Sequence, residues 1–435
     1  MQSKRAIVIG AGMSGLLAAR VAAEHFEQVT VLEKDTLPGP EARKGVPQGK
    51  HIHVLWTAGA KLLEQYFPGL FDDLAAAGGE SFDNSSDMRW YHGGVWKMRE
   101  PAGMRIHSQS RPLLEHHVRR ILLQRESVRI RRGSVNGLIM DQGAVGGVSI
   151  RPSEGADKDL AADLVIDASG RGSRLPAWLQ AHGLPAPAVE EVDVDLRYAT
   201  RQYERADGMD WKCMAVYGRP PDGTRAGVIF PIENNRWIVT LAGSFGDHPG
   251  GDDSGFLDFA RALDRPDLYE AIAKATAASD IACFSYPKEI WRRYDRHNKF
   301  PEGLAVIGDA MCSFNPLYGQ GVTVAALEAV QLDQCLGRGA PLKSYLRSAR
   351  NVIRYPWMLA TGNDALYPAA AHQRPWWAPA LGAYTDRVLR LSACNQQAHE
   401  SLLRVLHLAK TPFHLFRPAT LAAALFSQQA RPPRT

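Results

Sequence analysis

The sequence lacks the features that mark disulfide-rich, zinc-binding or membrane-spanning proteins. Its 435 residues include only five cysteines, which are widely spaced and form no Cys-x-x-Cys pair. An odd, scattered set of this kind argues against a disulfide framework or a zinc site and is typical of reduced thiols. No apolar run reaches about 18 residues, so the sequence predicts no transmembrane span.

The sequence also lacks a strong excess of one charge. Its net charge is +5 at pH 7, with no long run of one sign, which gives no support to nucleic-acid binding. The hydrophobic content of 45% is enough for a large core in a chain of this length. We therefore expect a large enzyme with two domains sharing one chain.

A glycine-rich turn near the N-terminus is the first informative motif. Gly10, Gly12 and Gly15 follow an apolar strand and open a helical run. Gly10 allows a tight turn, Gly12 lets the backbone approach a pyrophosphate, and Gly15 lets helix and strand pack closely. The helix N-terminus, at Met13 and Ser14, offers free N–H groups and a partial positive charge to phosphates.

A second apolar strand ends in an acidic residue. This residue, Glu33, lies 23 positions after Gly10 and is followed by Lys34. A carboxylate here can accept hydrogen bonds from both ribose hydroxyls and would repel a 2′-phosphate. A glycine turn present only for packing would not explain the whole series of strand, turn, helix, strand and acid. The series predicts that a dinucleotide binds here, with Lys34 beside its ribose.

The N-terminus offers one competing interpretation, a secretory signal peptide. Lys4 and Arg5 precede an apolar stretch, but Arg20 interrupts that stretch and no small-residue cleavage pattern follows it. We therefore expect a cytoplasmic protein.

A second glycine-rich segment begins nearly 300 residues later, at Gly308 and Asp309, after an apolar strand. A carboxylate at a strand end can hold a ribityl hydroxyl. The following glycines allow backbone N–H groups and a helix N-terminus to face the electron-rich edge of a reduced flavin. An ordinary capped loop is the alternative, but the two segments together are explained best as two ends of one bound FAD. The turn residues concerned are Pro316, Gly319, Gly321 and Val322.

Two arginines are candidates for neutralising the pyrophosphate. Arg43 lies in a loop after the second strand, and Arg111 opens a run with apolar residues at helical spacing. Arginine can bind a phosphate through a bidentate fork. The alternative for each is a solvated surface side chain.

The middle of the chain predicts an antiparallel sheet. Residues 196–203, 213–217, 227–232 and 236–242 are short alternating runs separated by turns. With residues 90–98 they would form a wall over the flavin, fit for an apolar substrate, although most of its large residues are expected to be ordinary core. These residues are Trp56, Met88, Trp90, Met98, Tyr217, Phe230, Trp237 and Phe284.

A histidine pair and the C-terminal stretch each allow a structural and a functional interpretation. His51 and His53 alternate on an extended segment and could bind a metal, but no third ligand is indicated, so we predict no metal and expect them to pack or to line a channel. Residues 402–426 mix leucines with basic residues. A helix packed against the domains is the favoured explanation, and contact with a membrane is the other.

Five motifs in series resemble one family. Besides the two glycine segments, they are residues 43–53, SRPLLEHHVRR from Ser110, and DLVIDASGRGSR from Asp163. Together they look like the FAD-dependent monooxygenases of the para-hydroxybenzoate hydroxylase fold, over about the first 340 residues. RKGVPQGKHIHVLW from Arg43 and AGVIFPIENNRWIVTLAG from Ala226 look similar to the bacterial epoxidases of polyether polyketide and terpenoid pathways.

The resemblance implies an α/β fold with three parts. A Rossmann-like FAD-binding domain would comprise residues 1–80, 108–185 and 290–340. It would be interleaved with an antiparallel-sheet substrate domain at 81–107 and 186–289, and C-terminal helices would occupy 341–435. One departure from the family is that Ala168 follows Asp167 where a glycine is commoner, which puts cofactor binding by Asp167 and Arg171 in doubt.

The resemblance also implies residue roles. Arg43 and Arg111 would neutralise the pyrophosphate, Asp309 would bind the ribitol, and Pro316 with residues 319–322 would border the isoalloxazine ring. Reduced FAD would react with O₂ to a C4a-hydroperoxide that transfers one oxygen atom to the substrate. The cofactor carries this chemistry, so we assign no catalytic acid or base.

The identity of the oxidised carbon rests on weaker signals. An alkene needs only an electrophilic oxygen donor, whereas phenol hydroxylation gains from a base, and no phenolate relay is evident unless Tyr217 or Tyr318 provides one. The expected reaction is epoxidation of an apolar polyketide or terpenoid olefin in secondary metabolism, such as antibiotic biosynthesis. The alternatives are aromatic hydroxylation, flavin-dependent reduction or cyclisation of an isoprenoid, and a non-catalytic escort role. A second GxGxxG is absent, so NAD(P)H that docks transiently or a partner flavin reductase would supply electrons.

Overall fold

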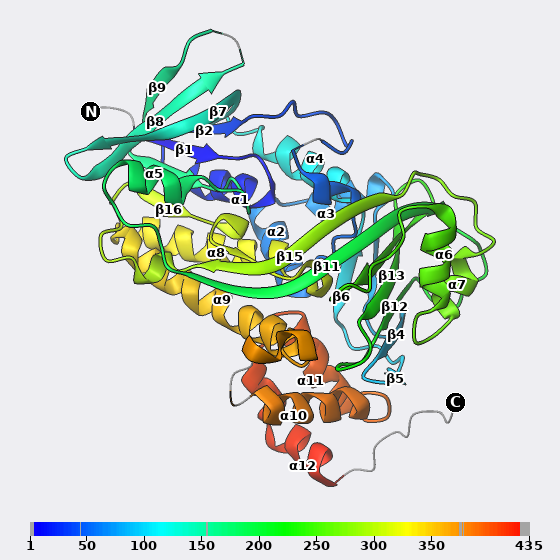
Figure 1. Cartoon of the computed structure of the whole chain (residues 1–435). Helices are drawn as coiled ribbons and strands as arrows, with labels where there is room; N and C mark the ends of the chain where they lie inside the picture. Colours follow the sequence, from blue (N-terminus) through cyan, green and yellow to red (C-terminus); the bar gives the residue numbers. More distant parts are fainter. Residues whose placement is uncertain (1–3, 44, 154, 374–375, 377, 427–435) are drawn as a thin grey trace.

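The computed structural model describes residues 4–43, 45–153, 155–373, 376 and 378–426, and is built around two large sheets (Figure 1). The first has seven strands in the order β16-β10-β1-β2-β7-β8-β9. Its five-strand core is parallel, and β8 and β9 extend it as antiparallel strands. The strands are β1 (Arg5–Ile9), β2 (Gln28–Glu33), β7 (Val128–Asp141), β8 (Ala144–Pro152), β9 (Lys158–Ala161), β10 (Leu164–Asp167) and β16 (Leu304–Val306).

The parallel core forms because its strands are nearly continuous apolar runs that are covered on both faces. In β1, Ala6, Ile7, Val8 and Ile9 are all buried, as expected of a parallel strand. Its covering helices include α1 (Met13–Ala22), α8 (Gly321–Gly337) and α9 (Leu342–Asp364), which pack side by side. The smaller helices of this half are α2 (Thr57–Tyr66), α3 (Leu70–Ala76), α4 (Arg111–Leu122) and α5 (Leu175–Ala181).

The second sheet has eight strands in the order β17-β15-β11-β14-β13-β12-β4-β5. Two long strands, β11 and β15, run as a curved ribbon from the first sheet to the second (Figure 1). The short helices α6 (Asp253–Arg261) and α7 (Asp267–Ile272) cover its outer face. The strands are β4 (Met88–His92), β5 (Val95–Trp96), β11 (Val189–Glu204), β12 (Cys213–Tyr217), β13 (Arg225–Ile232), β14 (Arg236–Gly243), β15 (Ala282–Arg292) and β17 (Cys312–Ser313).

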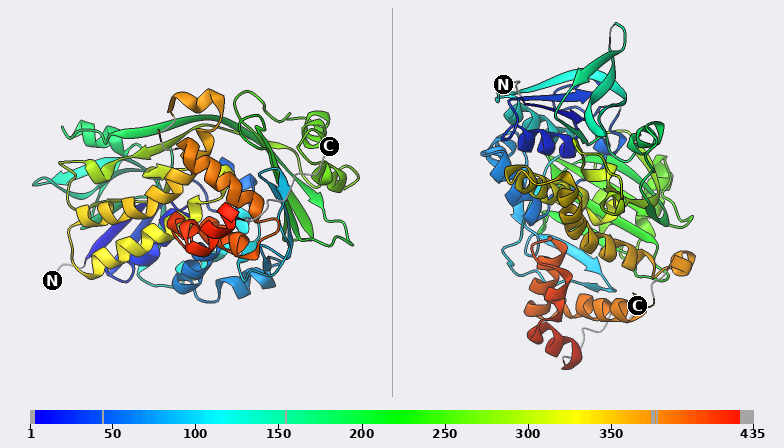
Figure 2. Two further views of the ribbon diagram at one scale, coloured as in Figure 1. Left: turned by 90° about the horizontal axis from the view of Figure 1, so that it is seen from below. Right: turned by 90° about the vertical axis from the view of Figure 1, so that its left-hand side faces the viewer.

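The remaining elements close the molecule. A small hairpin-like pair, β3 (Glu80–Asp83) and β6 (Arg105–Ser108), lies beside the second sheet. The helices α10 (Ala378–Leu391), α11 (Gln396–Leu406) and α12 (Pro418–Phe426) lie together at one end of the molecule (Figure 2). The 3₁₀ turns are η1 (Pro47–Lys50), η2 (Tyr294–Arg296), η3 (Gly308–Ala310), η4 (Pro316–Tyr318), η5 (Pro368–Gln373) and η6 (Pro412–Phe416).

The predicted α/β fold class is confirmed, with three corrections of detail. The second sheet is mixed, because β4 pairs in parallel with β12. Strand β11 begins at Val189, seven residues before the predicted start, because its N-terminal half pairs with β15 beyond a bulge. Trp237 faces away from the predicted substrate wall and stacks on Trp211 under α6 and α7.

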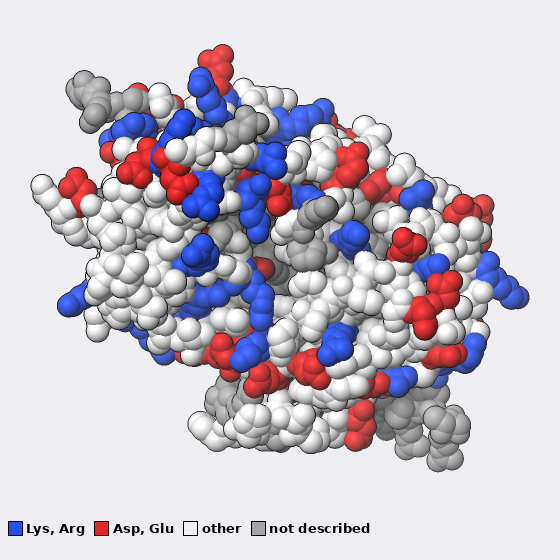
Figure 3. All heavy atoms as spheres, turned by 45° about the horizontal axis from the view of Figure 1, so that its top comes forward, with Lys and Arg blue, Asp and Glu red and all other residues white. Residues whose placement is uncertain are grey.

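The charges on the surface and the apolar residues of the C-terminal helices are the features relevant to binding nucleic acid or a membrane. On the face drawn in Figure 3, cations and anions are interspersed, in keeping with the small net charge. Among the described residues, none of the helices combines the length and apolarity needed to cross a membrane. Leu402, Leu403 and Leu415 pack against the second sheet, while Phe413 and Phe426 are exposed, and membrane contact stays the less favoured alternative.

Candidate active site

The turn between β1 and α1 has the geometry that its glycines predict. Gly10 adopts φ +101°, and a Cβ there would lie 2.7 Å from the carbonyl oxygen of Ala168. A side chain at Gly15 would collide with the Gly10 carbonyl. Gly12 begins α1 without a side-chain cap, so the first N–H groups of the helix face open space. The turn therefore leaves a donor-lined concavity beside the sheet.

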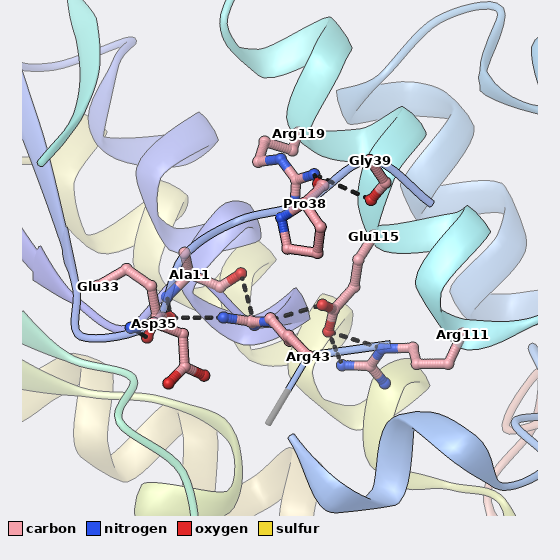
Figure 4. A network of polar contacts seen from close by, with 9 residues as sticks. All are labelled: Ala11, Glu33, Asp35, Pro38, Gly39, Arg43, Arg111, Glu115 and Arg119. Atoms are coloured by element: carbon pink, nitrogen blue, oxygen red, sulfur yellow. Dashed lines mark hydrogen bonds and ion pairs between the residues drawn. The ribbon is translucent and has the colours of Figure 1, made fainter. Parts of the chain in front are cut away.

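Glu33 lies directly beside this turn, at the end of β2 (Figure 4). Its Oε2 atom accepts hydrogen bonds from the Ala11 N–H and from Nη1 of Arg43, both at 2.8 Å. Burial disfavours its charged form, but these two donors outweigh burial and lower the pKa of Glu33. Glu33 is therefore a fixed carboxylate at neutral pH.

Glu115 joins the two predicted arginines and was missed by sequence reasoning. Its Oε2 lies 3.3 Å from Nη2 of Arg43, and its Oε1 lies 2.7 Å from Nη2 of Arg111 (Figure 4). All three side chains are less than a tenth exposed. The spacing of Arg111 and Glu115 on one helix was visible in the sequence, but the approach of Arg43 from another loop was not. The arginines are thus held in place rather than free on the surface.

Two of the predicted cofactor residues contribute little through their side chains. Met13 is buried in the core, so only its backbone faces the turn. Lys34 is exposed and makes no ion pair within the described part of the chain.

The second glycine segment meets the first in space. Gly308, at φ +67°, packs so closely against Ser14 that a side chain there would strike the Ser14 hydroxyl. Asp309 follows it, and a Cβ on Gly321 at the start of α8 would lie 3.9 Å from its Oδ1. Burial raises the pKa of Asp309, opposed by Arg111, Arg171 and Arg292.

The Asp309 carboxylate forms no side-chain hydrogen bond with the described residues around it. It is surrounded by protein, yet it keeps some accessible surface and accepts no hydrogen bond from any described residue. An acceptor in this position requires a donor from outside the chain.

The turn after Asp309 is built on two buried acids. Asn315 caps η4 through its side chain, and the turn ends at Gly319 in the left-handed region. The Asn315 N–H donates to Oε1 of Glu289 at 2.8 Å, and its side-chain amide donates to Oδ2 of Asp364 at 3.0 Å. Glu289 comes from β15 and Asp364 from the end of α9, so the second sheet and a long helix fix this turn. Neither acid was predicted, because no local signal marks them.

Tyr318 belongs to the same network. Its hydroxyl donates to Oδ1 of Asp364 at 2.6 Å and accepts from the Asn363 amide at 2.7 Å. Burial raises the pKa of Asp364 to about 6, and burial with the nearby Asp364 charge raises that of Glu289 well above its usual value. Glu289 is therefore favoured in its protonated form, beside an Asp364 that titrates just below neutral pH.

The two histidines of the extended segment have separate surroundings. Nδ1 of His51 lies 2.7 Å from the Thr200 hydroxyl, and its ring meets Tyr198 edge-on at 4.5 Å. Nδ1 of His53 lies 3.0 Å from the His51 carbonyl oxygen. Burial lowers the pKa of His51 to about 4 and that of His53 to about 3, so both are neutral.

Asp167 supports its own loop. It is fully buried and accepts from the Ser169 N–H at 3.0 Å, the Ser169 hydroxyl at 2.6 Å and the Ser173 hydroxyl at 2.5 Å. The serine in the Ala-Ser-Gly sequence is therefore a structural partner of Asp167. Arg171 stacks over the Tyr286 ring, with its guanidinium carbon 4.3 Å from the ring centre.

Comparison with known proteins identifies the family. Residues 6–177 match the family described as FAD dependent oxidoreductase. Protein Rv3254 of Mycobacterium tuberculosis is 34% identical over 92% of this chain and 88% of its own length. The chain belongs to the FAD-dependent oxidoreductases.

More distant relatives of this oxidoreductase include monooxygenases. Kynurenine 3-monooxygenase of Salinispora tropica is 25% identical over 77% of this chain and 72% of its own length. The solved structure of p-nitrophenol 4-monooxygenase PnpA of Pseudomonas putida aligns with a TM-score of 0.66 over 94% of this chain and 97% of that chain. At 16% identity, the second likeness shows the fold alone.

The residues present in the oxidoreductase fit FAD on two structural grounds. The unpartnered Asp309 carboxylate matches a ribityl hydroxyl in kind, and Gly12 leaves room for a phosphate, since the nearest atom to a Cβ there is Nη2 of Arg43 at 3.9 Å. Gly12 lies at the N-terminal end of α1 and Asp309 beside the N-terminal end of α8.

Proposed function

We propose that the chain is an FAD-dependent monooxygenase that epoxidises an olefin of an extended apolar substrate. When bound, reduced FAD supplies the activation of O₂. Glu33 would hold the adenosine ribose beside the glycine turn, Arg43 and Arg111 the pyrophosphate, and Asp309 the ribitol. The residues assigned to the isoalloxazine border are Pro316, Gly319, Gly321 and Val322.

The observation that carries the proposal is a row of apolar side chains on the second sheet beside the Asn315–Gly319 turn, which we call the apolar trough. On the inner face of the second sheet, Ala226 and Ala242 lie opposite each other on β13 and β14, between Tyr217 and Tyr198. Leu317 of the turn packs in the same apolar cluster. Small floor residues with large apolar walls suit an elongated hydrocarbon and exclude water from the reacting carbon.

The chain's own contribution to this reaction is positional. An alkene requires no proton transfer before an oxygen atom is added, so the proposed reaction needs no acid or base from the chain, and Asp309 is assigned to FAD. The Glu289 and Asp364 network would keep the turn rigid against the substrate.

Aromatic hydroxylation is the second candidate, supported by one specific contact. The Tyr318 hydroxyl has an acceptor in Asp364, which is the arrangement a phenolate relay requires. The names kynurenine 3-monooxygenase and p-nitrophenol 4-monooxygenase both denote action on aromatic compounds. The electron source, NAD(P)H or a partner flavin reductase, stays a prediction.

The deciding experiment supplies the chemically reduced holoenzyme with ¹⁸O₂ and either a polyene such as farnesol or a phenol such as 4-nitrophenol. We expect an epoxide of the polyene containing one ¹⁸O atom. A hydroxylated phenol without epoxide would replace the proposal by the second candidate. A product with no ¹⁸O would indicate a flavin-dependent reductase or cyclase, and a colourless protein that binds no FAD would indicate a non-catalytic role.

A further inference from the structure

Three polar side chains lie without partners in the apolar interior below the second sheet. They are Trp90 and His92 on β4 and Tyr217 on β12. Nε1 of Trp90 and Nδ1 of His92 are buried and make no hydrogen bond with any described residue. The Tyr217 side chain is half-buried, and its hydroxyl forms no hydrogen bond with a described residue. Unpaired polar atoms at this depth call for an explanation.

The three side chains form one niche because of strand register. In the parallel pairing of β4 with β12, Trp90 lies opposite Ala215, which places His92 beside Tyr217. The His92 and Tyr217 ring centres are 5.1 Å apart, and those of Trp90 and His92 are 5.7 Å apart. Ala215, opposite Trp90, has a small side chain. The three rings therefore lie next to one another on one face of the sheet.

The three side chains of the niche are uncharged, and Nζ of Lys97 lies 5.5 Å from the centre of the Trp90 ring. Burial lowers the pKa of His92 to about 3, so its ring is neutral at physiological pH. The nearest cation, Lys97, donates to the backbone carbonyl oxygens of His92 and Leu389. The groups on offer are the Trp90 N–H, the Tyr217 hydroxyl and a neutral imidazole, which together suit an oxygen atom without a formal charge.

The niche continues the apolar trough. Along the inner face of the sheet, Tyr217 is followed by Ala226, Ala242 and Tyr198 on successive strands. Neighbouring strands lie about 4.8 Å apart, so His92 is two strand spacings, or about 10 Å, from Ala226. Leu317 packs against this part of the trough.

We propose that Trp90, His92 and Tyr217 bind an uncharged oxygen group, a hydroxyl or a carbonyl, near one end of an extended apolar substrate. This anchor would place a carbon about 10 Å further along the molecule beside the Asn315–Gly319 turn. The inference rests on the proposed function for the reaction at that carbon. The niche itself selects the substrate whatever the reaction is.

The test measures binding to the oxidised holoenzyme and requires no turnover. The probes are farnesol, farnesyl methyl ether and farnesene, which share one chain and differ in the terminal oxygen. Dissociation constants are measured by calorimetry. We expect farnesol and its methyl ether to bind at least about tenfold more tightly than farnesene, because a site built for an oxygen discriminates against its absence.

Three variants test whether the preference for an oxygen-containing probe depends on the niche. His92→Phe and Trp90→Phe should each reduce it to less than about threefold while leaving farnesene binding unchanged. Tyr91→Phe is the matched control, since Tyr91 lies on the opposite face of the same strand, in the cluster under α6 and α7. If either niche variant fails to fold, Tyr217→Phe tests the same site with the loss of one oxygen atom.

Three results would overturn the inference. The wild-type protein could bind the three probes equally, it could bind none of them, or the preference for an oxygen-containing probe could survive in both niche variants. Failure of the proposed function is seen separately. An oxygen preference lost in His92→Phe, together with no epoxide from the ¹⁸O₂ experiment, would keep the niche and reject the epoxidase.

Discussion

The Tyr318 hydroxyl donates a hydrogen bond of 2.6 Å to Asp364, joining the turn after Asp309 to the end of a long helix. The contact has two consequences. It fixes the turn that is assigned to the flavin, and it provides a route by which a proton could leave a substrate hydroxyl. Phenol hydroxylation needs this proton route, whereas olefin epoxidation does not.

Replacing Tyr318 by Phe separates these reactions. We expect Tyr318→Phe to change the rate of olefin epoxidation by less than about threefold, because no proton is removed from an alkene. Hydroxylation of a phenol should fall by about 10² or more, the usual contribution of a positioned acid or base. Rates with farnesol and 4-nitrophenol, measured over pH 6–9, check this. A large loss with the olefin would contradict the proposed epoxidation.

Arg43 should matter for stability as well as for FAD. Arg43→Ala leaves Glu33 and Glu115 buried without their shared cation, which we expect to cost about 3 kcal/mol in the free energy of unfolding. FAD affinity should fall too. Urea unfolding of the apoprotein and quenching of FAD fluorescence measure the two effects.

Lys34→Ala is the matched control, because Lys34 is exposed and adjoins Glu33. It should leave the free energy of unfolding within about 0.5 kcal/mol of wild type. An Arg43→Ala protein as stable as the control would show that the network contributes nothing to folding.

Replacing Asp309 and replacing Asp167 should have opposite effects on stability, although Asp167 ends β10 and Asp309 lies just after the neighbouring strand β16. Asp309→Asn removes a buried, unpartnered charge, so apoprotein stability should stay the same or rise while the Kd for FAD increases about 10- to 100-fold. Asp167→Asn disturbs three hydrogen bonds and should destabilise the apoprotein by about 2 kcal/mol. Unfolding curves and FAD titrations of both variants decide this. Normal FAD affinity in Asp309→Asn would remove Asp309 from the site.

Asp364 should impose a pH dependence on stability. Its pKa is raised to about 6 in the folded protein, so the protonated form is favoured by folding. The stabilisation is complete below the unfolded pKa of about 4 and is lost as pH rises through about 6. Buried histidines such as His92, whose pKa values are lowered, act in the opposite sense, so the informative quantity is the difference between variant and wild type.

The comparison needed is the melting temperature of Asp364→Asn and wild-type apoprotein from pH 4 to 8. Relative to wild type, the variant should gain several degrees across this range, since its amide does not ionise. Asp207→Asn is the control, because Asp207 is exposed and its carboxylate forms no hydrogen bond or ion pair with a described residue. A constant difference between Asp364→Asn and wild type would mean that Asp364 does not titrate in this range.

The sequence by itself determined the parts of the site that are local. The glycine turn, Glu33 at the end of β2, Arg111 at the start of α4 and the Gly308–Asp309 segment all lie where the spacing predicts. Each depends on residues adjacent in the chain, because turn geometry, strand ends and helix starts are set by short-range backbone conformation.

Only the tertiary structure decided what those parts contact. Glu115 serves Arg43 from a distant helix, Glu289 and Asp364 approach the same turn from β15 and α9, and the His92 niche exists because β4 pairs in parallel with β12. Strand order and helix packing are long-range choices that leave no mark on local composition. A buried acid or histidine therefore acquires its role only when the fold supplies its partners, or withholds them.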